Sequence, residues 1–282
     1  MLLECAVADA YGAGFEFHDA ALPFNDLSAY RQHPKHTGIR PGMYTDDTAM
    51  SIAVAEAMLS GEPWTPWLLA SKFVECFHRD PRPGYAQRFY EFLLVTRTAD
   101  EFLANIRPDS ERSGAAMRAA PLGWLPTTDL VREYATVQAE VTHKTKAGVD
   151  SAVAAALMAF HLRHGVRPAD VGGVLDAAVP GYNWSIPFTG RVSVAGMDCV
   201  RAAVTAVVRS TGLSEMLQWV VNLGGDVDTV AAIAVSAASL SPHIQQDLPQ
   251  HLLNDVENGP YGREYLTQLD RQLTERFPKS AH

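Results

Sequence analysis

Two aspartates, two residues apart and followed by a threonine, form the most distinctive chemical pattern in the chain. The stretch is Asn222-Leu223-Gly224-Gly225-Asp226-Val227-Asp228-Thr229, and residues 230–240 after it carry no charge and are rich in alanine. Such a run predicts a helix that is apolar on every side and therefore buried. Unpaired carboxylates at its mouth need a proton, a basic partner or a metal. Because no Lys or Arg lies between Arg209 and Arg263, we expect a cation at Asp226 and Asp228.

A second stretch, Tyr44-Thr45-Asp46-Asp47-Thr48, has the same design and precedes residues 49–59, whose only charge is Glu56. Together the two motifs offer four carboxylates and several hydroxyls, with no Cys or His among them. An all-oxygen set suits Mg²⁺, Mn²⁺ or Ca²⁺ and argues against zinc or copper. Since one Mg²⁺ usually takes one or two carboxylates, the set favours a pair of metals, typically ~3.5–4 Å apart.

Helix capping is the alternative interpretation of these residues. Asp and Thr are common N-caps, so either motif alone is more typical of a capped helix than of a metal site. Capping does not explain why two acidic motifs each open an alanine-rich helix with little or no charge. We therefore favour a metal site for the pair.

Residues 5–17 are dominated by small side chains and carry two further carboxylates, Asp9 and Glu16. The glycines at 12 and 14 predict that a first helix ends between them. Glu16 is then expected in a loop, with Phe15 and Phe17 packed beside it. Residues 18–43 show little periodicity and are interpreted as a loop. Its three histidines, at 18, 33 and 36, are expected to be solvated or structural rather than metal ligands.

Two further segments could contact an anionic or sugar ligand. Residues 113–123 open with Ser-Gly on an alanine-rich run, which predicts free backbone N–H groups and room for a phosphate. A plain N-cap at Ser113 explains that start equally well. His143 falls near the start of a helix expected at 148–162, where a structural role is the alternative.

The composition limits the class of protein. The chain has 282 residues, 47% of them hydrophobic and 20% charged, with a net charge of −9. This balance suits a soluble domain with a sizeable core and argues against a general nucleic-acid or anionic-membrane binder. The three isolated cysteines indicate a reducing compartment. No signal peptide or membrane span is predicted, and we expect a cytoplasmic protein.

Strand patterns are scarce, and the periodicity predicts an all-α fold. Helices are expected near 66–79, 85–95, 127–141, 148–162, 197–210 and 213–222. No linker divides the chain, so we expect a single domain over residues 1–282.

Five motifs in succession resemble the ADP-ribosylglycohydrolase family, the relatives of dinitrogenase reductase-activating glycohydrolase. The motifs are Asp9-Ala10-Tyr11-Gly12-Ala13-Gly14-Phe15-Glu16, Thr45-Asp46-Asp47-Thr48, Ser113-Gly114-Ala115-Ala116-Met117-Arg118, Thr142-His143 and Gly224-Gly225-Asp226-Val227-Asp228-Thr229. The resemblance covers roughly residues 5–240. The chain departs from the family at Ala8, where Gly is usual, at Ser113, where Asn is usual, and at Val235 and Ser236, where glycines are usual.

The resemblance implies a compact, single-domain orthogonal helical bundle with two Mg²⁺ ions at its centre, Mn²⁺ being the alternative metal. The implied metal ligands are Thr45, Asp46, Asp47, Asp226, Asp228 and Thr229. Glu16 falls on an acidic position that takes part in catalysis or gating in some members. The diphosphate and ribose would lie on Ser113, Gly114, Ala115 and Met117, and His143 would contact the sugar.

The activity that the resemblance implies is Mg²⁺-dependent hydrolysis of the glycosidic bond between ADP-ribose and an acceptor. The ligand would be ADP-ribose or an ADP-ribosylated protein, and we expect a monomer. Glu16 and Asp46 are the candidate catalytic residues, and either could be the base. The acceptor stays open. The alternatives are a non-catalytic ADP-ribose binder, a crystallin-like structural protein on the same scaffold, or a Mg²⁺-dependent hydrolase of phosphate esters.

Overall fold

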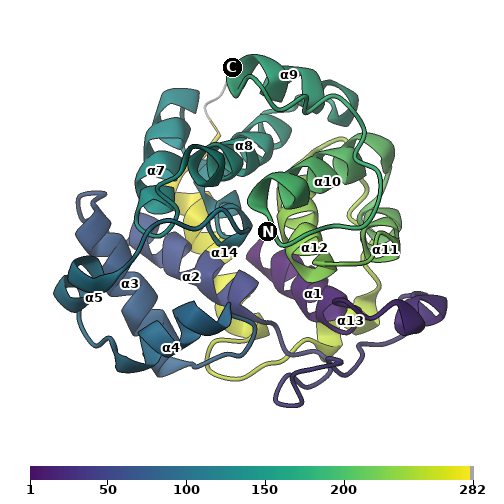
Figure 1. The fold of residues 1–282 in the computed structure, drawn as a ribbon. Helices are drawn as coiled ribbons and strands as arrows, with labels where there is room; N and C mark the ends of the chain where they lie inside the picture. The colour runs from purple at the N-terminus through teal and green to yellow at the C-terminus, as the bar shows by residue number, and fades with distance from the viewer. Residues whose placement is uncertain (280–282) are drawn as a thin grey trace.

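The computed structural model describes residues 1–279 and is built from helices and their connections (Figure 1). Among these residues the β-type pairings are isolated bridges outside any strand, such as Val192 with Gly225. The α-helices are α1 (Leu2–Ala13), α2 (Asp46–Leu59), α3 (Pro66–Arg79), α4 (Gln87–Val95), α5 (Ala99–Asn105), α6 (Gly114–Met117), α7 (Thr128–Glu140), α8 (Lys146–Arg163), α9 (Val171–Ala178), α10 (Gly196–Arg209), α11 (Leu213–Asn222), α12 (Val227–Ala238), α13 (Gln250–Asp255) and α14 (Arg263–Arg276). The described residues also form the 3-10 helices η1 (Asp19–Phe24), η2 (Ala120–Trp124) and η3 (Pro168–Asp170). The all-α prediction is confirmed.

The most buried helix is α12, in which every residue from Val227 to Ala238 is buried. It packs against α1, α8, α10 and α11, and Figure 1 places it beside α1 near the middle of the molecule. The prediction of a buried helix behind the second acidic motif is confirmed. The reason is composition: small and branched apolar side chains on all faces can be satisfied only inside a core.

Small residues let the central helices approach closely. A Cβ atom added to Gly12 in α1 would lie 2.5 Å from the Cα of Asp228 in α12. Real side chains never tolerate such a distance, so the glycine sets the spacing between the two helices. This close approach brings the C-terminal end of α1 to the first turn of α12.

The helices predicted from periodicity are present with small shifts at their ends. The expected helices at 66–79 and 213–222 coincide with α3 and α11, whereas α4 begins at Gln87 rather than at 85. The alanine-rich helix expected from Ser113 is corrected. It is the single turn α6, and the chain then tightens into η2, which carries Pro121 in its first turn.

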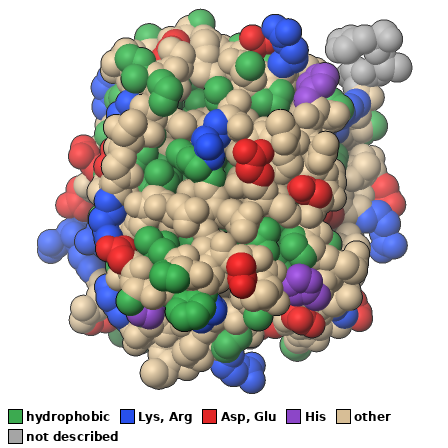
Figure 2. Space-filling model, turned by 90° about the vertical axis from the view of Figure 1, so that its right-hand side faces the viewer, with side chains coloured by type: hydrophobic (Ala, Val, Ile, Leu, Met, Phe, Trp, Pro, Cys, Tyr) green, Lys and Arg blue, Asp and Glu red, His purple; other side chains and the backbone are tan. Residues whose placement is uncertain are grey.

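No helix within residues 1–279 has the length and the apolar character required to cross a bilayer. On the face drawn in Figure 2, acidic, basic and hydrophobic side chains are intermixed, and none of the three gathers into one broad patch.

Candidate active site

The four aspartates of the two motifs lie at the N-terminal ends of α2 and α12. Asp46 and Asp47 are the first two residues of α2, Asp226 immediately precedes α12, and Asp228 is in its first turn. All four are buried, the most exposed being Asp46 at 9%. The side chains of the two N-cap residues, Thr45 and Asp226, make no capping hydrogen bond. The carboxylates therefore sit at helix N-termini without being used as caps of those helices.

The cap of α2 comes instead from Asp9 in α1. Its fully buried carboxylate accepts hydrogen bonds from the backbone N–H and the hydroxyl of Thr45 and of Thr48, at 2.6–3.1 Å. This interaction fixes the first motif against α1. Sequence reasoning assigned Asp9 no role, although an acidic residue among the small and apolar side chains of residues 5–13 was a signal that it has a buried partner.

The second motif is held by backbone geometry. Gly224 and Gly225 both have positive φ, +66° and +93°. A Cβ on Gly225 would lie 1.9 Å from the carbonyl oxygen of Val192, so no other residue fits this turn. Asp226 accepts hydrogen bonds from the Ser113 hydroxyl at 3.3 Å and from the Cys199 thiol at 3.6 Å. The turn and these two donors orient Asp226.

The electrostatics of the cluster favour binding a cation. Burial raises the pKa of Asp46, Asp47 and Asp228 well above the usual value, and neighbouring carboxylates add to each shift. Burial, followed by the charge of Glu16, raises the pKa of Asp226 to about 6. Within residues 1–279 no Lys or Arg forms an ion pair with these four aspartates. The negative charge is therefore not neutralised by the described protein side chains.

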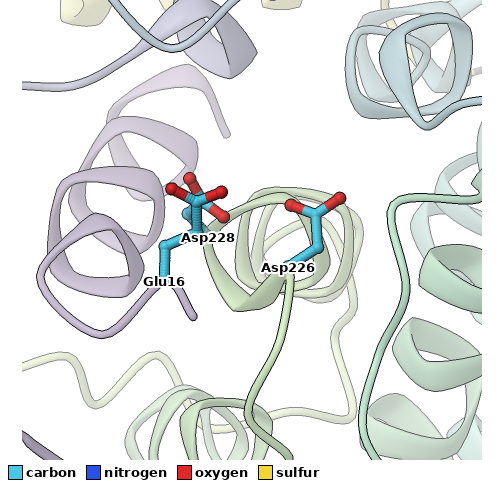
Figure 3. Close-up of side chains that lie close together, drawn as sticks. All are labelled: Glu16, Asp226 and Asp228. Atoms are coloured by element: carbon cyan, nitrogen blue, oxygen red, sulfur yellow. The ribbon is translucent and has the colours of Figure 1, made fainter. Parts of the chain in front are cut away.

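Among residues 1–279, two buried oxygens of the cluster lack a hydrogen-bond partner, Oδ1 of Asp47 and Oδ1 of Asp228. One carboxylate oxygen each from Glu16, Asp226 and Asp228 lie within 4.8 Å of one another. Figure 3 shows these three carboxylates extending to the same side of the first turn of α12. Buried oxygen atoms without a donor, in an all-oxygen set, fit a hard divalent cation.

The aspartates open into a cavity of about 1030 Å³, a size suited to a nucleotide-like ligand. The predicted site residues on its wall are Glu16, Asp46, Asp47, Ser113, Gly114, Met117, His143, Asp226, Asp228 and Thr229. Most of residues 84–92 and 105–112 also line the cavity. Gly84 packs directly against the first motif, since a Cβ atom at this position would lie 2.2 Å from Oδ1 of Asp46.

Two predicted site residues are not on the cavity wall. Ala115 is fully buried and packs with Ala139 and Ala152. The hydroxyl of Thr45 donates to Asp9 at 2.8 Å, with Asp47 a longer alternative at 3.3 Å. By contrast, Thr229 lies on the cavity wall, and its hydroxyl favours the ionised forms of Asp47 and Asp226.

His143 is buried at the end of a hydrogen-bonded chain that sequence reasoning did not foresee. Arg118 donates to the Thr142 hydroxyl at 2.8 Å, and that hydroxyl lies 2.7 Å from Nδ1 of His143. The Thr142 hydroxyl, which accepts from Arg118, can donate its own hydrogen to Nδ1, and in that arrangement Nε2 of His143 carries the ring hydrogen. Burial and then the charge of Arg118 lower the pKa of His143 to about 3. The ring is a neutral donor beside Gly114.

Comparison with known proteins decides the family. The ADP-ribosylglycohydrolase family model matches residues 1–282. The chain belongs to the ADP-ribosylglycohydrolase family.

Relatives of this family member come from all domains of life. Human ADP-ribosylhydrolase ARH3 is 26% identical to it over 82% of the chain and 81% of the human protein. An uncharacterised protein of Archaeoglobus fulgidus is 25% identical over 97% and 94% of the two chains. ADP-ribosylarginine hydrolase Tri1 of Serratia proteamaculans is 24% identical over 82% of the chain and 67% of that protein. A solved structure titled "ADP-ribosylglycohydrolase-related protein complex" has the same fold, with a TM-score of 0.73 at 22% identity over 97% and 95% of the two chains.

Two departures of this chain from the family pattern have local explanations. Ser113 supplies the hydroxyl that binds Asp226. Ser236 is fully buried in α12, and its hydroxyl is satisfied within the helix by the carbonyl groups of Ala232 and Ile233. The structure gives no reason for Ala8, which is simply buried in α1.

Proposed function

We propose that this protein hydrolyses linkages of ADP-ribose, and specifically the glycosidic bond that joins ADP-ribose to a modified protein side chain or another acceptor. The observation that carries the proposal is the cluster of buried, uncompensated carboxylates on the wall of a cavity of about 1030 Å³. Family membership and relatives named as ADP-ribosylhydrolase and ADP-ribosylarginine hydrolase support the same reaction class.

The cluster is suited to two Mg²⁺ ions held by Thr45, Asp46, Asp47, Asp226, Asp228 and Thr229, with Mn²⁺ as the alternative. The fit rests on the all-oxygen donor set and on the unpartnered oxygens of Asp47 and Asp228. When bound, such ions supply positive charge that polarises oxygen atoms of the substrate and of water.

The protein's own groups would then act on a bond whose cleavage passes through an oxocarbenium-like state. The surrounding carboxylates stabilise the positive charge that develops on the sugar. Glu16 lies on the cavity wall beside Asp228 and is the leading candidate to take a proton from the attacking water. Asp46, on the same wall, is the second candidate.

Residues near the start of α6, together with His143, are proposed to position the substrate. The neutral His143 ring presents its Nε2–H beside Gly114, which suits a sugar oxygen. Ser113, Gly114 and Met117 line the adjoining wall, where the diphosphate and ribose are proposed to bind. The backbone of Ala115 belongs to the same turn, whereas its side chain does not face the cavity.

The test is a substrate panel of peptides ADP-ribosylated on arginine or on serine, ADP-ribosylated nucleic acid and O-acetyl-ADP-ribose, scored for released ADP-ribose. We expect release from at least one substrate with Mg²⁺, loss of release with a chelator, and recovery with Mg²⁺ or Mn²⁺. Full activity of metal-free protein would contradict the metal assignment. Tight binding of ADP-ribose without any hydrolysis would favour the non-catalytic binder instead.

A further inference from the structure

His33 lies in the loop after α1, seventeen residues from Glu16 in sequence, yet the two side chains meet. Its ring is buried, at 2% exposure. Nε2 of His33 is 2.8 Å from Oε2 of Glu16. On the other side of the ring, Nδ1 accepts the backbone N–H groups of Lys35 and His36, both at 3.0 Å.

The two backbone donors fix the form of the ring. A nitrogen that accepts N–H hydrogen bonds carries no hydrogen, so the hydrogen of the neutral imidazole must be on Nε2. Nε2–H therefore donates to the Glu16 carboxylate. We infer that His33 is a positioning residue, which holds the carboxylate of Glu16 toward the aspartates of the second motif. This inference rests on the proposed function, in which Glu16 takes part in the reaction.

The surroundings of Glu16 explain why such a donor is needed. Carboxylate oxygens of Glu16, Asp226 and Asp228 lie within 4.8 Å of one another, and like charges at that range repel. In the described part of the chain no Lys or Arg forms an ion pair with Glu16, and the side chain that donates a hydrogen bond to its carboxylate is His33. A glutamate side chain is flexible, and without a donor it would turn away from the two aspartates into solvent.

The backbone of the same loop is anchored independently of His33. The N–H of Phe17 donates to the carbonyl of Gly225 at 2.9 Å, which ties the loop to the second motif. Gly14 lies against Arg31, where an added Cβ would come within 2.7 Å of the Arg31 Cβ. The main chain at Glu16 is therefore placed by its neighbours, and the side-chain direction is what His33 determines.

The two nitrogens of His33 can be removed separately. In His33→Asn the amide oxygen lies where Nδ1 was, so the loop keeps its acceptor while Glu16 loses its donor. In His33→Gln the amide nitrogen reaches the place of Nε2, so Glu16 keeps a donor while the loop loses its acceptor. Each variant is the matched control for the other.

The experiment measures kcat, KM and thermal unfolding of both variants with a substrate that the wild-type protein hydrolyses, and the Kd of ADP-ribose by calorimetry. We expect His33→Asn to lower kcat by roughly 10–100-fold, as is usual for residues that orient a functional group, with Tm and the Kd of ADP-ribose close to wild type. We expect His33→Gln to lower Tm and to recover most of kcat. Wild-type kcat in His33→Asn, or an equal loss of kcat in both variants, would overturn the inference.

A double-mutant cycle checks that His33 acts through Glu16. In the Glu16→Gln background His33→Asn should cause no further loss of kcat. A second, multiplicative loss in that background would overturn the positioning role, because His33 would then act on something other than Glu16.

A measurement without turnover separates this inference from the proposed function. Nitrogen NMR of histidine-labelled protein distinguishes the two tautomers, and the signal missing in His33→Asn assigns the residue. We expect an Nε2–H ring whose Nε2 signal moves in Glu16→Gln, even if no ADP-ribosylated substrate is hydrolysed and the proposed function fails. An Nδ1–H tautomer of His33, or an Nε2 chemical shift that is unchanged in Glu16→Gln, would overturn the inference.

Discussion

The motif carboxylates are energetically costly in the absence of a cation. Burial raises their pKa values, and that of Asp226 reaches about 6. The folded state therefore holds the Asp226 proton more tightly than the unfolded state, whose pKa is about 3.9. The stabilisation is complete below that value and is lost as the pH rises through about 6. At pH 7.5 the metal-free protein retains an ionised, buried Asp226.

Asp226→Asn is expected to remove that cost together with the metal site. In chelator at pH 7.5 the variant should unfold at the same temperature as wild type or higher. With Mg²⁺, wild type should gain in Tm because the ligand binds only the folded state, and the variant should gain little and lose hydrolysis. Thermal unfolding with and without Mg²⁺ measures both effects. An equal Mg²⁺ gain in the two proteins would contradict the assignment of Asp226 as a ligand.

His143 gives a pH dependence of opposite sign. Its pKa is lowered to about 3 in the folded protein, against about 6.5 when unfolded. The contribution of the neutral His143 to the free energy of unfolding is fully present above about pH 6.5. It decreases at lower pH, because the unfolded state binds a proton that the folded state does not bind. Wild type should therefore lose about 1.4 kcal/mol more per pH unit than His143→Asn between about pH 6 and pH 4. Denaturant unfolding of both proteins at several pH values tests this. The same dependence of unfolding free energy on pH in wild type and His143→Asn would contradict it.

At the scale of helices, the first motif depends on the junction between α1 and α2. Asp9→Ala would leave the backbone and hydroxyl donors of Thr45 and Thr48 without their acceptor. Each buried donor left unpaired costs about 1–3 kcal/mol, so we expect a marked loss of unfolding free energy and weaker Mg²⁺ binding. Asp9→Asn keeps one acceptor oxygen and should cost less. Denaturant unfolding and metal titration of both variants measure the difference, and an unchanged Asp9→Ala protein would contradict this role.

The spacing of α1 and α12 depends on one glycine. Gly12→Ala would place a Cβ 2.5 Å from the Cα of Asp228, and such overpacking typically costs 1–3 kcal/mol. We expect a lower Tm and weaker Mg²⁺ binding, because the first turn of α12 must move. Gly173→Ala is the matched control, since this helical glycine in α9 has nothing within 4 Å. It should leave Mg²⁺ binding unchanged and raise stability by ~0.4–1 kcal/mol.

Long helices could be predicted from the sequence, and short ones could not. The apolar periodicity of α3 and α11 spans several turns and gave their positions directly. The helices α5 and α9 are only seven and eight residues long, too short for a clear period. The run after Ser113 has strong helix formers, but Pro121 and the close packing of Gly123 against Ala159 fit a 3-10 helix there.

The site could be predicted only where its residues are neighbours in sequence. The two aspartate motifs combine their candidate metal ligands within a few positions, so the composition of each motif is visible in the sequence. Asp9 and His33 act on residues that are brought near by the packing of α1 and by the course of a loop. Nothing local to His33 indicates that its ring faces Glu16. Such pairings are properties of the tertiary structure.

At the scale of the whole molecule, we propose that the chain is a single domain over residues 1–282. Leu2 near one end and Leu273 near the other belong to one continuous hydrophobic core, and α1 packs on both α12 and α14. Calorimetry of the metal-free protein should therefore give one cooperative transition, with equal calorimetric and van 't Hoff enthalpies. Two separated transitions would contradict the single domain.

The separation of the two aspartate motifs in sequence has a consequence for how the protein folds. Asp9 and Asp46 come from an early part of the chain, whereas Asp228 comes from a late part. The cluster therefore exists only after chain segments of very different length have been closed into loops. A partly folded chain cannot offer the complete set of carboxylates. A cation that needs the complete set would therefore bind only after these loops have closed. It would leave the folding rate nearly unchanged and slow unfolding, so that the metal governs how long the folded protein persists rather than how quickly it forms.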